Sequence, residues 1–252
     1  MQATGRRALI TGAARRIGRA VAERLAGDGY ALALHASQRS EPAAQDLAAK
    51  IMEEGGTAVV VTGDLASVEE TGRLLAMAEA SIGSIDVLVN NASVYEPDSA
   101  LQFDAMAFDR HMAINLRAPL QLAAAFFQAL PDNARGSIVN ITDQKVWRLN
   151  PRFFSYTLSK SALWTATQTM AQAYAPRVRV NAIGPGPVLP NHIDGADGFE
   201  KEAAALPLGS SVAPDEIAAA VMYLVDAQSV TGQMIAVDGG QHLAWRTPDV
   251  ID

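Results

Sequence analysis

Residues 143–160 read Asp143-Gln-Lys-Val-Trp-Arg-Leu-Asn-Pro-Arg-Phe-Phe-Ser-Tyr156-Thr-Leu-Ser-Lys160, and the other segments can be placed around them. The apolar run 137–142 before them predicts a buried strand, and residues 153–173 predict a helix because no breaker interrupts them. Asp143 follows the strand directly, and open parallel sheets hold their ligands at the carboxyl ends of their strands. The stretch therefore predicts a strand, a polar residue at a ligand site and a helix, in that order.

Two side chains of the predicted helix indicate acid–base chemistry. Tyr156 and Lys160 are four residues apart, so they share one helix face. An ammonium beside a phenol favours the phenolate, and Lys160 is therefore expected to lower the pKa of Tyr156. This makes Tyr156 a candidate proton donor near neutral pH. The alternative is a pair of exposed helix residues without a function.

The composition excludes several classes of protein. The chain has 252 residues, 49% of them hydrophobic and 19% charged, which is enough apolar sequence for a large core. A net charge of -7 argues against nucleic acid as a partner. Because there is no cysteine, disulfides and thiolate chemistry are excluded, and the four histidines show no metal-ligand spacing. No apolar run approaches the ~20 residues of a membrane span. We expect a cytoplasmic protein without a metal.

The start of the chain has the layout of a phosphate-binding turn. The apolar residues 8–10 lead into Thr-Gly-Ala-Ala-Arg-Arg-Ile-Gly at 11–18, and an apolar helical pattern follows. Gly12 permits a tight turn, and Gly18 permits close packing of helix on strand. Arg16 takes the place of the usual middle glycine, and its guanidinium could bind a phosphate through two hydrogen bonds. The alternative is a charged surface pair, Arg15 and Arg16.

The second predicted strand, 30–35, indicates which dinucleotide the chain binds. An acidic residue at its end would bind the ribose 2′-hydroxyl of NAD, but no acid follows His35 until Glu41. Arg39 and Ser40 suit a 2′-phosphate instead. The sequence therefore favours NADPH over NADH, with a solvated loop arginine as the alternative.

Taken together, these patterns resemble the short-chain dehydrogenase/reductase family. The resemblance rests on the glycine turn, on Asn-Asn-Ala at 90–92, on Tyr-x-x-x-Lys and on Gly-Pro-Gly-Pro at 184–187. The family usually has serine thirteen residues before the tyrosine, where this chain has Asp143. That substitution is similar to the pteridine reductases and bacterial dihydromonapterin reductases, whose catalytic set is Asp-Tyr-Lys.

The alternation of strands and helices predicts an α/β fold: a doubly wound parallel sheet of the Rossmann type, with seven strands and helices on both faces. We expect residues 1–252 to form a single domain. Residues 191–209 could be a mobile lid over the substrate, which would span roughly 187–210, or an unstructured surface loop, and the tail 245–252 is unassigned. Residues 104–130 predict a helix with a break near Pro119, and Ser67 with Glu70 predicts a capping box.

The resemblance assigns roles to individual residues. It implies a catalytic set of Asp143, Tyr156, Lys160 and Asn115, with Asn115 helping to hold a proton-relay water through its backbone. Tyr95, Asp143 and Tyr156 would bind substrate, with Tyr95 stacking a pterin against the nicotinamide. The implied cofactor contacts are Gly12, Arg16, Ile17, Gly18, Arg39, Ser40, Asp64, Leu65, Asn90, Ala92, Ser93, Tyr156, Lys160, Pro185, Gly186 and Val188. The threonine that the family usually has shortly after the last of these segments is missing.

The resemblance also implies an activity and an assembly. The activity is NADPH-dependent reduction of a C=N bond in a dihydropteridine such as dihydromonapterin or a dihydrofolate-like compound. The alternatives are a general carbonyl or alcohol reductase and a non-catalytic NADP(H)-binding regulator or scaffold. Residues 120–130 and 153–173 are apolar on more than one side, which indicates a deep core or a subunit interface. Because the family is mostly tetrameric, we expect a homotetramer.

The predicted cofactor preference can be measured directly. Each charge-assisted contact to a 2′-phosphate contributes ~1.5–3 kcal/mol, so NADPH should bind at least about tenfold more tightly than NADH. Fluorescence titration of the protein with both dinucleotides measures this ratio. Equal or tighter binding of NADH would contradict the assignment of Arg39 and Ser40.

Overall fold

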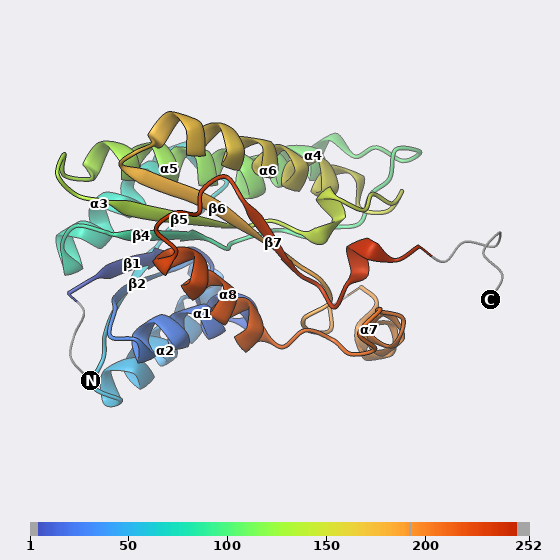
Figure 1. The fold of residues 1–252 in the computed structure, drawn as a ribbon, viewed down its shortest axis with the longest axis horizontal. Helices are drawn as coiled ribbons and strands as arrows, with labels where there is room; N and C mark the ends of the chain where they lie inside the picture. The colour runs from blue at the N-terminus through green and yellow to red at the C-terminus, as the bar shows by residue number, and fades with distance from the viewer. Residues whose placement is uncertain (1–4, 192, 246–252) are drawn as a thin grey trace.

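The computed structural model describes residues 5–191 and 193–245, which form one parallel sheet with helices on both faces (Figure 1). The sheet order is β3-β2-β1-β4-β5-β6-β7. The strands are β1 Arg7–Ile10, β2 Ala31–Ala36, β3 Thr57–Thr62, β4 Val87–Asn90, β5 Gly136–Ile141, β6 Val178–Pro185 and β7 Met234–Val237. The predicted doubly wound sheet is confirmed, and the strand ranges 8–10, 30–35 and 137–142 given above differ from β1, β2 and β5 by one residue.

Two layers of helices bury the two faces of this sheet (Figure 1). One layer consists of α1 Arg16–Gly27, α2 Glu41–Glu53 and α8 Pro214–Asp226, and the other of α3 Val68–Ile82, α4 Ala105–His111, α5 Ala118–Ala129 and α6 Phe154–Tyr174. The first layer packs an aliphatic core that includes Leu25, Leu47 and Val221. The second packs a core around Phe126, one of the largest fully buried side chains. Because both faces are covered, most residues of the central strands are buried and apolar.

The chain changes winding direction between β1 and β4, which are neighbours in the sheet. The glycine turn lies here, because Thr11 N–H donates to Val89 O at 2.9 Å and Ala13 N–H donates to His35 O at 3.0 Å. A topological switch point leaves a crevice outside the carboxyl ends of the strands, where ligands bind in open α/β sheets. The phosphate-binding turn predicted from the sequence therefore lies at the expected place in the fold.

The predicted helix 104–130 is interrupted at a different place from the one expected. The break was predicted near Pro119, but Met112–Arg117 form a π-helical segment, η2, and α5 begins after it. Pro119 lies near the start of α5, which continues the π segment directly, so the proline does not break the chain of helices. The π segment is the actual irregularity, and it contains Asn115.

Three other sequence predictions are corrected or not covered. The unstructured-loop alternative for residues 191–209 is wrong, because Gly195–Ala204 form helix α7. The capping box at Ser67 is only half formed: Ser67 accepts from Glu70 N–H, but the Glu70 carboxylate accepts from Asp64 N–H rather than from Ser67. Apart from Trp245, the C-terminal tail lies outside the described residues. Among the helices of residues 5–191 and 193–245, none is long and apolar enough to cross a membrane.

The close packing of α1 against the glycine turn gives a test of the fold. A β-carbon on Gly18 would lie 2.2 Å from the carbonyl oxygen of Gly12, whereas one on Gly27 would meet nothing within 4 Å. We expect Gly18→Ala to lower the free energy of unfolding by ~1–3 kcal/mol through overpacking, and to weaken dinucleotide binding. Gly27→Ala is the matched control in the same helix and should be neutral or slightly stabilising. Denaturant unfolding of both variants measures this, and equal stability of the two would contradict it.

Candidate active site

A hydrogen bond between Tyr156 and Asp143 forms the centre of the site. The Tyr156 hydroxyl donates to Asp143 Oδ2 at 2.8 Å. Asp143 follows β5 and caps the short 3-10 helix Gln144–Val146 (η3), because its Oδ1 accepts from Lys145 N–H at 2.8 Å. Tyr156 lies in the first turn of α6 and is only 7% exposed. The strand and the helix thus bring together the two residues that the sequence placed thirteen positions apart.

Lys160 is buried one turn further along α6, but it does not contact the Tyr156 hydroxyl. Its Nζ donates to Ile141 O at 2.8 Å and lies 5.8 Å from the centre of the Tyr156 ring. Burial lowers the pKa of Lys160 to about 8, and the Asp143 carboxylate opposes that shift. The hydrogen bond to Ile141 O on β5 therefore offsets part of the cost of burying the Lys160 ammonium.

The prediction that Lys160 lowers the pKa of Tyr156 is wrong in this structure. Burial and the neighbouring Asp143 carboxylate raise the pKa of Tyr156 well above its ordinary value. The phenolate would be both desolvated and beside a negative charge, and these two effects determine the direction of the shift. Tyr156 therefore keeps its proton at neutral pH.

Aromatic side chains pack beside the Tyr156 ring. The Tyr95 ring stacks on Phe153 with a centroid distance of 4.1 Å and meets the Tyr156 ring edge-on at 4.8 Å. Lys145 Nζ lies 5.7 Å from the centre of the Tyr95 ring and 3.9 Å from Asp143 Oδ1. Sequence reasoning missed Phe153 and Lys145. Both residues lie in the sequence between Asp143 and Tyr156, and this position was the signal that could have identified them.

Asn115 is fully buried and anchors the segment that carries Tyr95. Its Oδ1 accepts from Val94 N–H at 2.9 Å and from the Ser93 hydroxyl at 3.1 Å, and its Nδ2 donates to Val94 O at 3.0 Å. Nδ2 also donates to the Ser159 hydroxyl on α6 at 3.1 Å. The side chain of Asn115 therefore joins η2, the chain after β4 and α6, and its predicted backbone role in holding a water stays a prediction.

Hydrogen bonds from the chain after β4 fix the conformation of the glycine turn. The Asn91 side chain donates to the carbonyls of Thr11 and Gly12 at 2.9 and 3.1 Å, and the Thr11 hydroxyl accepts from Asn91 and Ala92 N–H. Helix α1 has no side-chain cap and no acidic residue in its first turn. Its first N–H groups therefore suit an anion such as a pyrophosphate. Thr11 and Asn91 were missed as site residues, although both belong to the motifs quoted from the sequence.

Arg16 and Asn90 lie differently from the sequence expectation. The Arg16 guanidinium donates to Leu189 O at 3.0 Å and Pro190 O at 2.8 Å, and burial lowers its pKa. It therefore connects the glycine turn to the segment after β6 instead of facing the turn as a phosphate ligand. Asn90 is buried, and its Nδ2 donates to Asn140 Oδ1 at 2.9 Å, so its side chain joins β4 to β5.

The end of β2 offers no carboxylate to a ribose. His35 is buried between Gly12 N–H and Gly63 O, at 3.2 and 3.0 Å, and the exposed Arg39 lies in the short helix Gln38–Ser40, η1. Ser40 is fixed by bonds to Ser37. Asp64 accepts from Ala66 N–H at 2.9 Å, and Leu65 is buried. This cationic and hydroxyl-bearing corner suits a 2′-phosphate.

The remaining predicted contacts follow β6. Gly186 N–H donates to Val237 O at 3.0 Å, and a β-carbon on Gly186 would lie 2.6 Å from the Asp238 Cα. Pro185 ends β6, and Val188 is buried in the aliphatic core. Ile17 packs partly buried against the same core.

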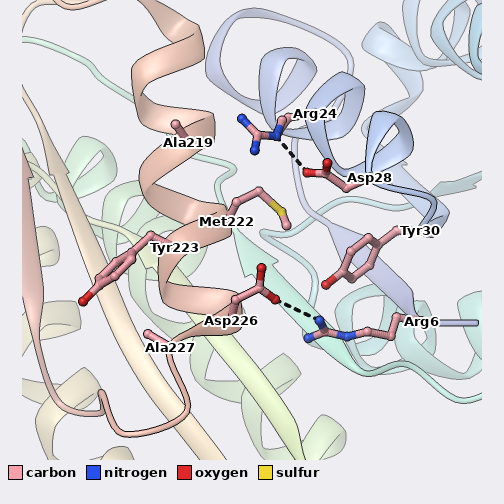
Figure 2. Close-up of a pocket in the computed structure, with 9 residues that line it drawn as sticks. All are labelled: Arg6, Arg24, Asp28, Tyr30, Ala219, Met222, Tyr223, Asp226 and Ala227. Atoms are coloured by element: carbon pink, nitrogen blue, oxygen red, sulfur yellow. Dashed lines mark hydrogen bonds and ion pairs between the residues drawn. The ribbon is translucent and has the colours of Figure 1, made fainter. Parts of the chain in front are cut away.

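Two clefts lie away from this site. One of ≈ 700 Å³ lies between α1 and α8, beside the amino ends of β1 and β2 (Figure 2). Its charged side chains pair with one another, Arg6 with Asp226 at 3.0 Å and Arg24 with Asp28 at 2.8 Å. The other, of ≈ 870 Å³, follows the outer surface of α4, η2 and α5. Neither of these two clefts is lined by Asp143 or Tyr156.

A glycine turn at the switch point of a doubly wound sheet, with a buried Tyr–Lys pair at the carboxyl ends of the strands, defines a dinucleotide-dependent oxidoreductase. A family model described as enoyl-(acyl carrier protein) reductase matches residues 12–242. The chain belongs to the short-chain dehydrogenase/reductase family.

Individual relatives are similar over nearly the whole chain. An uncharacterized oxidoreductase of Methylorubrum extorquens is 35% identical over 244 residues, covering 94% of this chain and 97% of the relative. The crystal structure of FolM alternative dihydrofolate reductase 1 from Brucella canis, complexed with NADP, is 48% identical, with a TM-score of 0.94 and coverage of 98% and 97%. The Brucella suis protein of that name, also with NADP, is 48% identical with a TM-score of 0.94 and 98% coverage of each chain.

The buried ammonium of Lys160 predicts how stability depends on pH. Its folded-state pKa of about 8 is below the unfolded value of 10.5, so the unfolded state binds more protons between these values and stability rises with pH there. The gain from pH 7 to 9.5 should be about 2 kcal/mol. Lys160→Met, which cannot titrate, should lose this increment. Denaturant unfolding of both proteins at the two pH values measures the difference, and parallel pH dependence would contradict the assignment.

Proposed function

We propose that this protein is an NADPH-dependent reductase of a dihydropteridine, acting on a C=N bond of a dihydromonapterin- or dihydrofolate-like substrate. The observation that carries the proposal is the 2.8 Å hydrogen bond from Tyr156 to Asp143, at the position where the family usually has a serine. The naming of two structures at 48% identity as alternative dihydrofolate reductases supports the same substrate class.

NADP(H) is the cofactor. Both Brucella structures are complexes with NADP. The residues of this chain fit that dinucleotide, because the first turn of α1 has no side-chain cap and the corner after β2 presents Arg39 and Ser40 without an acid. When bound, NADPH supplies the hydride that reduces the C=N carbon.

Tyr156 donates the proton that the substrate nitrogen needs. Its raised pKa keeps the hydroxyl protonated until a basic nitrogen develops beside it. Asp143 orients that hydroxyl, and each of its oxygens can accept a further bond from an N–H of the pterin. An ionised carboxylate cannot polarise a ketone by donating to it, which distinguishes this site from one that has serine. Lys160 binds the nicotinamide ribose.

The family usually has a serine hydroxyl at the position of Asp143, and the neighbouring Thr142 is a poor candidate to replace that hydroxyl. Its Oγ1 donates to Ile183 O at 2.7 Å and is buried inside the sheet beside Met234. The Thr142 hydroxyl is therefore directed toward the backbone of β6 and Met234, and no hydrogen bond joins it to Tyr156 among the described residues. Asp143 therefore remains the side chain that meets Tyr156.

Tyr95 provides the flat surface that a pterin requires. Its ring is held by Phe153 on one side and has the Lys145 ammonium above it. A heteroaromatic ring can stack in an offset arrangement on such a platform, within reach of the Tyr156 hydroxyl. Lys145 adds a cation that can face the carbonyl oxygen of the pterin.

Helix α7 and the segments around it form the proposed lid, residues 187–210. The ion pair between Arg152 and Asp194, at 2.9 Å, connects the start of α7 to the chain just before α6. Arg16 connects residues 189 and 190 to the glycine turn. These two contacts support the proposal, because they connect the segment to the glycine turn and to the chain before the Tyr156 helix, so that it could close over both.

We also propose a homotetramer. Leu158 on α6 is 38% exposed, and α5 carries the half-buried apolar residues Leu120 and Phe127. These outward apolar side chains, with the cleft along α4 and α5, would be covered by the same helices of a second subunit.

Variants of Asp143 test the proposed reaction. We expect Asp143→Ala to lower kcat/KM for dihydropterins by ~10²–10⁴-fold, the range of general acid–base groups, while the Kd for NADPH stays near the wild-type value. Asp143→Ser should not restore pterin reduction, although its hydroxyl can improve the reduction of simple carbonyls. Steady-state NADPH oxidation with dihydropterins and carbonyl compounds, measured side by side, gives these values.

Thr142→Ala is the matched control, because it alters the neighbouring residue and leaves the hydrogen bond between Asp143 and Tyr156 in place. It should lower thermal stability and keep most of the pterin rate. If Asp143→Ala kept its pterin rate and Thr142→Ala lost it, the hydroxyl of Thr142 would be the catalytic group and the pteridine proposal would be wrong.

A further inference from the structure

The N-terminus of α6 has no cap from its own segment. The residue before the helix, Phe153, has left-handed backbone angles, φ 58° and ψ 53°, and makes no side-chain cap. The first N–H groups of any helix lack intrahelical partners, and a helix end buried without a substitute is unstable. Tyr156 lies in this first turn, so the placement of the proton donor depends on whatever satisfies the turn.

Asp98, which lies 57 positions before Ser155 in the chain, accepts the hydrogen bonds that this first turn cannot make within the helix. Ser155 N–H donates to both carboxylate oxygens of Asp98, at 3.0 and 3.1 Å, and the Ser155 hydroxyl donates to Oδ2. The backbone carbonyl of Asp98 accepts from Phe153 N–H at 3.0 Å. The carboxylate also places a negative charge at the positive end of a helix of 21 residues.

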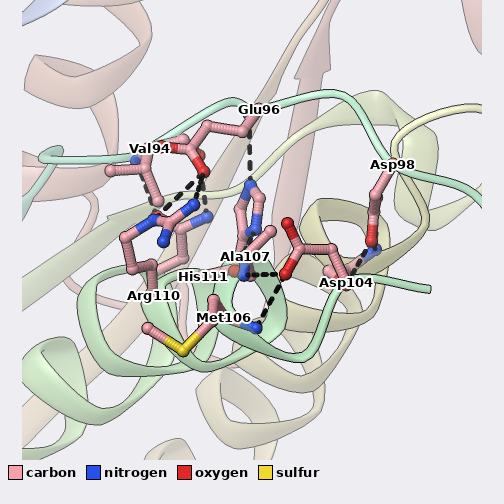
Figure 3. A network of polar contacts seen from close by, with 10 residues as sticks. Val94, Glu96, Asp98, Asp104, Met106, Ala107, Arg110 and His111 are labelled. Atoms are coloured by element: carbon pink, nitrogen blue, oxygen red, sulfur yellow. Dashed lines mark hydrogen bonds and ion pairs between the residues drawn. The ribbon is translucent and has the colours of Figure 1, made fainter.

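The segment that carries Asp98 is itself fixed to α4 and η2 (Figure 3). Asn115 holds Val94 by two hydrogen bonds, and the buried His111 ring accepts from Glu96 N–H at 3.2 Å while donating to Ala107 O at 2.8 Å. Glu96 forms an ion pair with Arg110 at 2.6 Å. These contacts with α4 and η2 therefore hold the segment 94–98, and with it Asp98, in place.

The same segment carries Tyr95, whose ring lies between Phe153 and Tyr156. Asp98 thus connects the proposed substrate platform and the proton donor through one side chain. Loss of the carboxylate would release the first turn of α6, with Tyr156 in it, while Lys160 stays one turn inside the helix.

We infer that Asp98 is a positioning residue for the reaction. It lies in the segment 94–98, which also carries Tyr95, and by capping α6 it sets the position of Tyr156 relative to Tyr95. The inference rests on the proposed function for the identity of the substrate, but the capping contacts are independent of it. Asp98 acts through Ser155 and Phe153 and does not touch the reacting atoms.

Asp104 provides a matched control in the same connection. It is also an aspartate that caps a helix, because its Oδ1 accepts from Met106 and Ala107 N–H at 2.9 and 3.2 Å, but the helix is α4 (Figure 3). Removing either carboxylate removes one helix cap. Only the loss of Asp98 disturbs the turn that contains Tyr156.

The experiment compares Asp98→Ala, Asp98→Asn and Asp104→Ala in the full chain. Asp98→Ala should lower kcat by ~10²-fold, the effect of misplacing a reacting group by about 1 Å, with little change in the Kd for NADPH. Asp98→Asn keeps an acceptor oxygen toward Ser155 and should recover most of that loss. Asp104→Ala should keep the wild-type kcat while melting at a lower temperature.

Rates are measured with the substrate that the wild type reduces fastest among dihydropterins and carbonyl compounds. If that substrate is a carbonyl and dihydropterins are inert, the proposed function is wrong, but the comparison of variants still holds. If the Asp98 variants and Asp104→Ala share the wild-type kcat, the inference is overturned whatever the substrate. Should Asp98→Ala not fold, Asp98→Asn decides: a kcat that is a few-fold below the wild-type value, with unchanged NADPH binding, supports the inference, and a full wild-type kcat contradicts it.

Discussion

The hydrogen bond from the Tyr156 hydroxyl to the Asp143 carboxylate is the contact on which the proposed chemistry of this protein depends. It joins the end of β5 to the first turn of α6, and the phenol is almost entirely buried. Because a buried phenolate beside a carboxylate is unfavourable, the pKa of Tyr156 is raised and the tyrosine stays a proton donor. The nitrogen that develops on hydride transfer to a C=N carbon can take that proton, as can the alkoxide that develops from a carbonyl. Under the proposed function, the contact serves the reduction of a C=N bond.

The surrounding fold holds this pair from several directions. Lys160 donates to the backbone of β5, Asn115 connects α6 to the chain after β4, and Asp98 caps the helix. The glycine turn is supported separately, by Asn91 and Thr11 at the switch point. Separate contacts thus fix the glycine turn and the Tyr156 helix. Arg16 connects the glycine turn to residues 189 and 190, and Arg152 connects the chain before α6 to Asp194 at the start of α7. Such an arrangement can hold the reacting groups in their relative positions before the substrate binds.

Local sequence patterns were sufficient for much of this structure. The apolar runs predicted the parallel strands, and the spacing of Tyr156 and Lys160 correctly placed both on one helix turn. What the sequence could not provide were contacts between distant segments. The cap of α6 comes from Asp98, and the guanidinium of Arg16 bonds to carbonyls more than 170 positions away. The π segment at Asn115 leaves no signal in hydrophobic periodicity. The effect of Lys160 was misjudged because burial, which depends on the whole fold, outweighed a neighbour on the same helix face.

The most direct test of the account is NADPH oxidation by the wild-type protein with 7,8-dihydropterins and simple carbonyl compounds under the same conditions. A site built on Asp143 and Tyr156 should give a kcat/KM for a dihydropterin that exceeds the values for all the carbonyl compounds. Turnover of carbonyls without measurable turnover of any dihydropterin would contradict the role assigned to the pair.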